Sequence, residues 1–316
     1  MNTDRIDIDA LPGERWFAKE SSSIEEMTEY WGDWGVSSET NKLQAVLMRR
    51  PGAEIEDFDW KEARFKSAID PIKFRQQHDA LAEIYKKNGV EVYYVDEQRK
   101  DRPNALFCRD LLFMTPEGAI VTRPAMEARR GEERFVAETL GDIGVPIVKT
   151  VTGNAIFEGA MGMWIDRSTV ILATGVRTNR AGYDMVAHEL ERMGVKDVIH
   201  MQIPYGHAHI DGNLNLASND IAVVHSPQVP YDVVDVLKRK GYKILECPSR
   251  TEAKETFAIN FVAIEPGSIV MPEGNPRTQE LLEKNGVKVT TVDFSEIIKG
   301  YGAIHCCTAF LKREDQ

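Results

Sequence analysis

The sequence predicts an α/β fold in which five ββαβ units surround a pseudo-fivefold axis and the C-terminal strand closes the ring. Two observations support this prediction. A hairpin, a helix and a further strand recur in the same order four times, and the two ends of the chain carry complementary parts of a fifth unit. Repeated units bury their apolar faces against one another, so they predict one repeat domain rather than several domains. A conventional doubly wound sheet is the alternative fold.

The first complete unit starts at residue 111. Its hairpin is LLFMTPEGAIVTRP, two apolar stretches around a Pro-Glu-Gly turn, and it is followed by the helical pattern RGEERFVAETLGDIG and the strand VPIVKTV. The other three units repeat the order hairpin, helix, strand. The second is GMWIDRSTVILATG, YDMVAHELERMG and VKDVIHMQI, and the third is GNLNLASNDIAVVHSP, YDVVDVLKRKG and YKILECP. The fourth is FAINFVAIEPGSIVMPEG, NPRTQELLEKNG and VKVTTVDF. Each helix is followed by glycine, the residue that tolerates a left-handed cap.

The fifth unit is divided between the two ends of the chain. LQAVLMRRPG, FRQQHDALAEIYKKNG and VEVYYVD lack one hairpin strand, and CTAFLKRE is a strand without a unit. Pairing the two removes an exposed sheet edge and ties the ends together. We therefore expect a single domain over residues 41–316 and an N-terminal extension over residues 1–40. The extension carries Trp31 and Trp34 and is expected to pack on the ring or on a second subunit, as in a homodimer.

The composition narrows the classes of function. The chain has 316 residues, of which 42% are hydrophobic and 28% charged, as in soluble globular proteins. It has no apolar run that could span a membrane, and the polar start MNTDRIDIDALPGERW lacks a signal peptide's apolar region, so a cytoplasmic location is expected. A net charge of -11 without a basic stripe argues against nucleic-acid binding. The four cysteines lack the spacing of a metal site or a disulfide framework.

Polar residues stand immediately before the first strand of successive units. Asp110 and Glu158 are 48 residues apart, and His209 follows Glu158 by 51 residues. Cys306 precedes the last, unpaired strand. Equivalent positions in a closed ring converge on its axis, so we expect these four side chains to meet. A thiol with a histidine and carboxylates is the constellation that nucleophilic catalysis needs.

Each of these residues also has a structural interpretation when it is considered alone. Asp110 could cap a turn, Glu158 could be a solvated loop carboxylate, and His209 could be an ordinary residue on the polar face of a strand. The adjacent cysteines could be two small buried hydrophobes, and if they lie in extended backbone only one of them faces any given site. The functional interpretation is favoured because these residue types occur together, at equivalent positions of successive repeats.

Several ordered motifs resemble the guanidino-group-modifying superfamily, which includes arginine deiminase, dimethylarginine hydrolase, agmatine deiminase and the amidinotransferases. The matching pieces are R-D at 109–110, F-E-G at 157–159, R-T-N at 177–179, H-I-D at 209–211 and H-C-C-T at 305–308. The resemblance extends from about residue 38 to the C-terminus. It implies a five-bladed α/β propeller and a hydrolase acting on the guanidino group of arginine or an arginine-like small molecule.

The resemblance also implies a role for each residue. Cys306 would attack the guanidino carbon and form a thiouronium-type intermediate. His209, oriented by Glu158, would protonate the departing amine and then activate water. Asp110 and Asp211 would hold the guanidinium nitrogens, as carboxylates hold arginine. Neither a metal nor an organic cofactor is required.

The end of the substrate opposite the guanidino group is less clearly defined. Arg129 and Arg177 follow Asp110 and Glu158 by 19 residues each and resemble the superfamily's carboxylate-binding arginines. Arg130 or Arg180 could substitute for them, and surface arginines at the end of a hairpin are the structural alternative.

One position departs from the superfamily pattern. Met161 stands where many members carry an acidic residue, which points to a differently shaped guanidino substrate. Amidinotransfer to an acceptor amine is the alternative reaction. A non-enzymatic binding propeller, similar to translation factors with this ring shape, is the alternative of another class.

Overall fold

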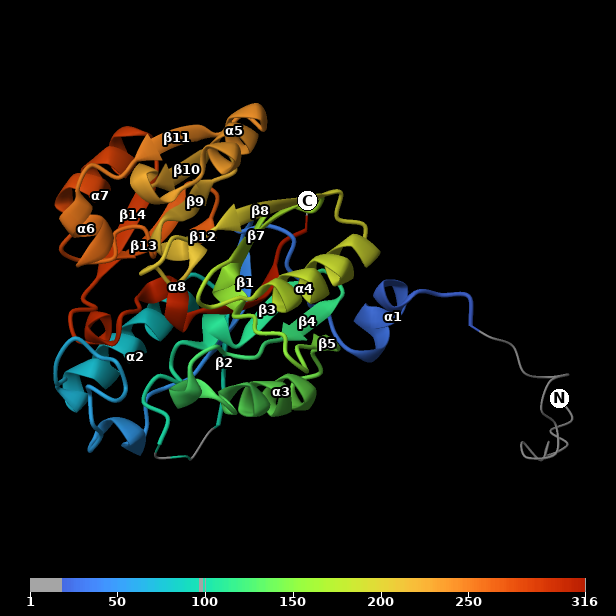
Figure 1. Ribbon diagram of the computed structural model, residues 1–316, viewed down its shortest axis with the longest axis horizontal. Coiled ribbons are helices and arrows are strands. Elements are labelled where there is room, and N and C mark those ends of the chain that lie inside the picture. The colour runs from blue at the N-terminus through green and yellow to red at the C-terminus, as the bar shows by residue number, and fades with distance from the viewer. Residues whose placement is uncertain (1–18, 97–98, 100, 316) are drawn as a thin grey trace, which may run out of the picture.

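The computed structural model describes residues 19–96, 99 and 101–315 and has a mixed α/β fold with five three-stranded sheets (Figure 1). Residues 1–18 of the expected extension lie outside the described residues. Within the described part of the chain, no helix is long and apolar enough to cross a membrane. The five sheets correspond to the five units predicted from the repeats.

Four of the sheets are formed by consecutive strands. In each, the first two strands form an antiparallel hairpin and the third joins parallel to the second after a helix. The strands are β3 (Leu112–Thr115), β4 (Gly118–Val121) and β5 (Ile147–Thr150); β6 (Gly162–Asp166), β7 (Thr169–Thr174) and β8 (Asp197–Gln202); β9 (Leu214–Ser218), β10 (Ile221–Val224) and β11 (Lys243–Glu246); and β12 (Val262–Glu265), β13 (Ser268–Pro272) and β14 (Lys288–Val292).

The fifth sheet joins the two ends of the chain, as the sequence predicts. β15 (Ala309–Arg313) pairs antiparallel with β1 (Leu43–Met48), and β1 pairs parallel with β2 (Glu91–Tyr94). The register places Leu47 opposite Ala309 and Val46 opposite Phe310. The last strand of the chain therefore completes the sheet that the first strand begins.

One longer helix precedes the third strand of every sheet. These helices are α2 (Pro71–Lys87), α3 (Glu132–Asp142), α4 (Arg180–Arg192), α5 (Tyr231–Arg239) and α7 (Pro276–Lys284). The glycines that follow them, Gly89, Gly144, Gly194, Gly241 and Gly286, have φ between 76° and 90°. This left-handed conformation ends each helix and turns the chain toward its next strand.

The remaining helices are short. They are α1 (Ser23–Tyr30), α6 (Arg250–Lys254) and α8 (Ile304–Cys307), with 3-10 turns η2 (Ala53–Ile55), η3 (Cys108–Asp110), η4 (Glu127–Arg129), η5 (Gly159–Met161), η6 (Ile210–Gly212), η7 (Ser226–Gln228) and η8 (Ile297–Gly300). The turns η3, η5 and η6 and the helix α8 each stand directly before the first strand of a sheet. They carry the residues that the sequence singled out.

The described part of the extension packs on the fifth sheet. Trp34 contacts Tyr93 of β2 edge-on, with ring centroids 5.6 Å apart. The Gly35 N–H donates to the Leu311 carbonyl of β15 at 3.1 Å. Trp31 remains 52% exposed.

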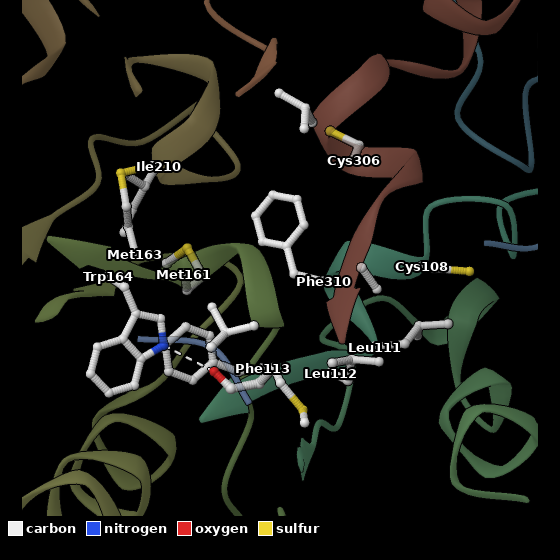
Figure 2. Packing of buried hydrophobic residues seen from close by; sticks show 14 of the residues in the cluster. Cys108, Leu111, Leu112, Phe113, Met161, Met163, Trp164, Ile210, Cys306 and Phe310 are labelled. Carbon is white, nitrogen blue, oxygen red and sulfur yellow. Dashed lines mark hydrogen bonds between the residues drawn. The ribbon is translucent and has the colours of Figure 1, made fainter. Parts of the chain in front are cut away.

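The core lies between neighbouring sheets and beneath the turns that precede them (Figure 2). The rings of Phe113 and Trp164 stack with centroids 5.9 Å apart, and the Trp164 indole N–H donates to the Met114 carbonyl at 2.9 Å. Met161 is fully buried in this cluster and does not line the cavity into which Cys306 and His209 face, so its position gives it a packing role. It does not shape a substrate site directly.

Candidate active site

A cavity of about 510 Å³ opens where the turns before the first strands meet. Asp110, His209, Asp211 and Cys306 all line it. Glu158 is fully buried behind His209. The structure therefore brings together the five residues for which the sequence suggested catalysis or guanidinium binding.

Cys306 lies on the single helical turn α8 rather than in extended backbone. The reason is Asn260, whose side-chain oxygen accepts hydrogen bonds from the backbone N–H of His305 (3.0 Å) and of Cys306 (3.3 Å). The Asn260 amide also donates to the Cys306 sulfur at 3.2 Å. Consecutive residues on a helix point about 100° apart, so only one cysteine faces the cavity. Cys307 is fully buried and does not line it.

The Cys306 thiol is held in its neutral form by its surroundings. Its sulfur lies 3.7 Å from Asp211 Oδ2, and it is only 6% exposed. Burial and the negative charges of Asp211 and Asp110 raise the pKa of this thiol well above its ordinary value. A positive charge placed between these carboxylates would remove much of that electrostatic penalty.

His209 and Glu158 form a buried acid–base pair. His209 Nε2 lies 2.6 Å from Glu158 Oε2 and 3.5 Å from Asp110 Oδ1. Burial alone would lower the pKa of His209, but Asp110 and the hydrogen bond with Glu158 raise it. Burial alone would raise the pKa of Glu158, but His209 and Arg177 lower it to about 2. The ionised carboxylate of Glu158 therefore stabilises the protonated form of the His209 imidazole.

Asp110 has one oxygen that accepts a hydrogen bond and one that does not. Oδ2 accepts a hydrogen bond from Arg129, whereas the buried Oδ1 has no hydrogen-bond partner among the described residues. A buried acceptor without a donor costs free energy, which a ligand with N–H donors can recover. A planar guanidinium supplies such donors in a fixed geometry.

The predicted arginines differ in where they lie. Arg129 also lines the cavity, but it is only 3% exposed and is bound to Asp110 and, through Nε at 2.9 Å, to Glu132. Arg177 lines the cavity and lies 3.2 Å from Glu158 Oε1. Both of these arginines support carboxylates of the site. Arg130 lies on the surface, paired with Glu127 at 2.7 Å, and does not line the cavity.

One group of described residues has the spacing of a metal site. Ligand atoms of Asp110, Glu158 and His209 all lie within 4.8 Å of one another. These residue types are ligands that a divalent transition metal accepts. The Glu158 oxygens, however, already accept hydrogen bonds from His209, Arg177 and the backbone N–H of Ala125.

Sequence reasoning assigned no role to three residues of the site, Glu39, Asn260 and His305, although His305 belongs to the H-C-C-T motif. Asn260 could have been found, because it follows His209 by 51 residues and precedes the first strand of its sheet. It thus occupies the place in its unit that Asp110, Glu158 and His209 occupy in theirs. No spacing pattern singles out Glu39, which reaches the site from the extension.

Comparisons with known proteins identify the family of the chain. A family model described as N,N dimethylarginine dimethylhydrolase, eukaryotic, matches residues 47–313. The chain is 26% identical over 244 residues to N(G),N(G)-dimethylarginine dimethylaminohydrolase of Pseudomonas aeruginosa, covering 75% of this chain and 88% of that protein.

Two solved structures illustrate the similarity in fold. A structure of the Pseudomonas aeruginosa dimethylaminohydrolase with citrulline has a TM-score of 0.71 at 21% identity, covering 85% of this chain and 99% of that one. SxtG, an amidinotransferase from Microseira wollei, has a TM-score of 0.74 at 14% identity, covering 90% and 98%. Similarity at this level of identity concerns the fold alone.

Proposed function

Because this chain belongs to the N,N dimethylarginine dimethylhydrolase family, we propose that it is a cysteine-dependent hydrolase of the guanidino group of arginine or an arginine-like compound. The observation that carries the proposal is one cavity lined by Cys306, Asp110 and Asp211, with the Cys306 sulfur beside Asp211 and His209 paired with Glu158. The family's members and structural neighbours include guanidino-group hydrolases and amidinotransferases.

We further infer that the five sheets form a closed propeller around a pseudo-fivefold axis. Contacts between successive sheets support this inference. β15 contacts β3, η3 contacts η5, η5 contacts η6, β9 contacts β12, and β12 contacts β1. The series returns to its starting sheet, and the residues of the site lie at the same end of each sheet.

Substrate binding would activate the nucleophile. A guanidinium between Asp110 and Asp211 donates hydrogen bonds to both carboxylates and balances their charge. The pKa of Cys306, which burial and these two carboxylates raise, then falls, and the thiol releases its proton to solvent in the cavity, from which it is recovered at the end of the cycle. The thiolate attacks the guanidino carbon and forms a C–S bond, giving a tetrahedral adduct.

His209 would carry the proton transfers that follow. The protonated imidazole donates its proton to the departing amine as the C–N bond breaks, leaving a covalent thiouronium-type intermediate. The neutral imidazole then accepts a proton from a water molecule that attacks the same carbon. Cleavage of the C–S bond releases a ureido product, and the thiol regains its proton. Glu158 stabilises the charged imidazole in the first step.

Two cations at the cavity are available for a distal carboxylate. Arg129 is not one of these two cations. It is fully engaged by Asp110 and Glu132, so it positions these carboxylates and does not bind the substrate's carboxylate. Arg64 lines the cavity without an ion-pair partner among the described residues. Lys254 also lines it, and within the described part of the chain its ammonium has one hydrogen-bonding partner, His207 Nε2 at 3.2 Å, and no carboxylate. We therefore propose that these two cations, with Arg177, favour a guanidino acid over an amine such as agmatine.

The test is turnover of a panel of guanidino compounds, followed by mass spectrometry of products and of the Cys306 peptide. Arginine, dimethylarginine, a guanidino acid and agmatine are each offered with and without an acceptor amine. A ureido product supports the hydrolase, and a product formed only with the amine makes the chain an amidinotransferase. The matched control is Cys307→Ser, which should remain active where Cys306→Ser is inactive. No turnover and no adduct would favour a non-enzymatic binding propeller.

A further inference from the structure

The residue before the proposed nucleophile, His305, is bound by carboxylates at both ring nitrogens. Nε2 lies 2.6 Å from Glu39 Oε1, and Nδ1 lies 2.7 Å from Asp211 Oδ2. His305 is 1% exposed, and the two carboxylates are 2% exposed each. An ionised carboxylate only accepts hydrogen bonds, so both nitrogens must donate. His305 lowers the pKa of both carboxylates, which favours their ionised forms, and with both ionised the ring must be doubly protonated and positively charged.

The carboxylates of Asp211 and Glu39 stabilise this buried cation. Burial alone would lower the pKa of His305, but the hydrogen bonds with Asp211 and Glu39 raise it. Glu39 Oε2 also lies 3.6 Å from Arg109 Nη2, and Arg313 is a further nearby cation. Buried charges are tolerated only when they are paired in this way, and removing one partner exposes the others to the full cost of burial.

The contact with His305 determines where Asp211 points. The oxygen that His305 holds, Oδ2, is also the one 3.7 Å from the Cys306 sulfur. The other oxygen, Oδ1, has no hydrogen bond to any described residue, and Asp211 lines the cavity. One oxygen is thus fixed beside the thiol, and the second is left for a ligand.

We propose that His305, as an imidazolium anchored by Glu39, is a positioning residue that fixes the ionised carboxylate of Asp211 for the substrate's guanidinium. This inference rests on the proposed function, because it assigns Asp211 to cation binding. It also gives the extension a role in the site, since Glu39 lies outside the repeat units. Without His305, Asp211 loses its orientation and the partner that keeps it charged.

A matched pair of alkylating reagents tests the proposal without knowledge of the true substrate. Chloroacetamidine is a small cationic electrophile that resembles a guanidinium, and chloroacetamide is its neutral counterpart. The rate of Cys306 alkylation by each is followed by mass spectrometry. We expect the wild-type protein to prefer the amidine. His305→Asn and Glu39→Gln should reduce this preference roughly 10- to 100-fold, as expected for a lost hydrogen bond between charged groups, while the amide rate changes little.

Controls separate this inference from the proposed function and from misfolding. Glu54→Gln removes another buried carboxylate, paired with Arg49 at 2.5 Å outside the cavity, and should keep the amidine preference. If the wild-type protein shows no preference and no turnover, the proposed function fails. If it shows a preference that both His305→Asn and Glu39→Gln retain, the positioning role is overturned.

A second measurement examines the protonation of His305 directly in the wild-type protein. Nitrogen-15 NMR of the histidine rings at about pH 8, well above the ordinary histidine pKa, should find both nitrogens of His305 protonated. Glu39→Gln should shift the His305 signals and so identify them among the seven histidines. A neutral His305 ring at that pH would contradict the proposal.

Discussion

Replacing Glu158 with glutamine should weaken the proton affinity of His209. The substitution keeps the shape of the side chain and removes the charge that lies 2.6 Å from His209 Nε2. It also leaves Arg177, whose charge lowers the pKa of His209, without its partner at 3.2 Å. Both changes act in the same direction, because each disfavours the imidazolium.

The size of the effect follows from the kind of contact that is lost. A hydrogen bond between charged groups contributes about 1.5–3 kcal/mol. Each 1.4 kcal/mol is a factor of ten, so the proton affinity of His209 should fall roughly 10- to 100-fold. The imidazole then releases its proton at lower pH, and less of the acid that protonates the leaving amine is present near neutrality.

Two measurements check this prediction. NMR titration of His209 should show the transition at lower pH in Glu158→Gln than in the wild-type protein, and the alkaline limb of the kcat profile should move the same way. Glu189→Gln is the control, because Glu189 is also buried but pairs with Arg192 on α4 at 2.6 Å, away from the site. A His209 titration that is unchanged in Glu158→Gln refutes the pairing as the origin of the raised pKa.

Three further predictions concern stability and substrate preference. Gly159→Ala should lower the free energy of unfolding, measured with a chemical denaturant, by about 1–3 kcal/mol and reduce activity, because the new Cβ would lie 2.0 Å from the Leu112 carbonyl oxygen. The control is Gly141→Ala, whose new Cβ meets nothing within 4 Å and should not destabilise the protein. Burial lowers the pKa of His78 to about 4 from 6.5, so the folded protein binds this proton less readily than the unfolded chain and loses stability as pH falls between these values. His78→Leu should therefore reduce the loss of unfolding free energy between pH 7 and pH 4 by about 3 kcal/mol, and an undiminished loss would contradict this assignment. Arg64→Ala should raise KM for a guanidino acid about fivefold, as for an ion pair of about 1 kcal/mol, and leave KM for agmatine unchanged; equal changes for both substrates would remove Arg64 from carboxylate recognition.

Much of the fold could be predicted because the repeats carry strong local signals. Alternating apolar stretches and terminal glycines define each strand and helix, and the unpaired β15 had one available partner, β1. The convergence of Asp110, Glu158 and His209 followed from the same periodicity. These features depend on residues close together in the sequence or on equivalent places in the repeat.

The parts that could not be predicted depend on contacts between distant residues. The helical turn at Cys306 is stabilised by Asn260, 46 residues earlier, and nothing local to IHCC reveals this. Arg129 has a spacing suited to carboxylate binding, but burial commits it to Asp110 and Glu132. Glu39 reaches His305 across 266 residues of chain. Such pairings are set by the three-dimensional arrangement: the repeat spacing can single out a residue such as Asn260, but it does not reveal the partner of that residue.

The sheet shared by β1 and β15 has a consequence for how the protein is made. β1 ends at residue 48 and its antiparallel partner begins at residue 309. At a translation rate of roughly 5–20 residues per second, this edge stays without its partner for about 15 to 50 seconds on the ribosome. Cys306 is synthesised just before β15 and is seated on α8, which is contiguous with that strand. The nascent chain therefore acquires its complete cavity only when its last strand emerges, and a chain stalled earlier exposes an apolar edge suited to chaperone binding.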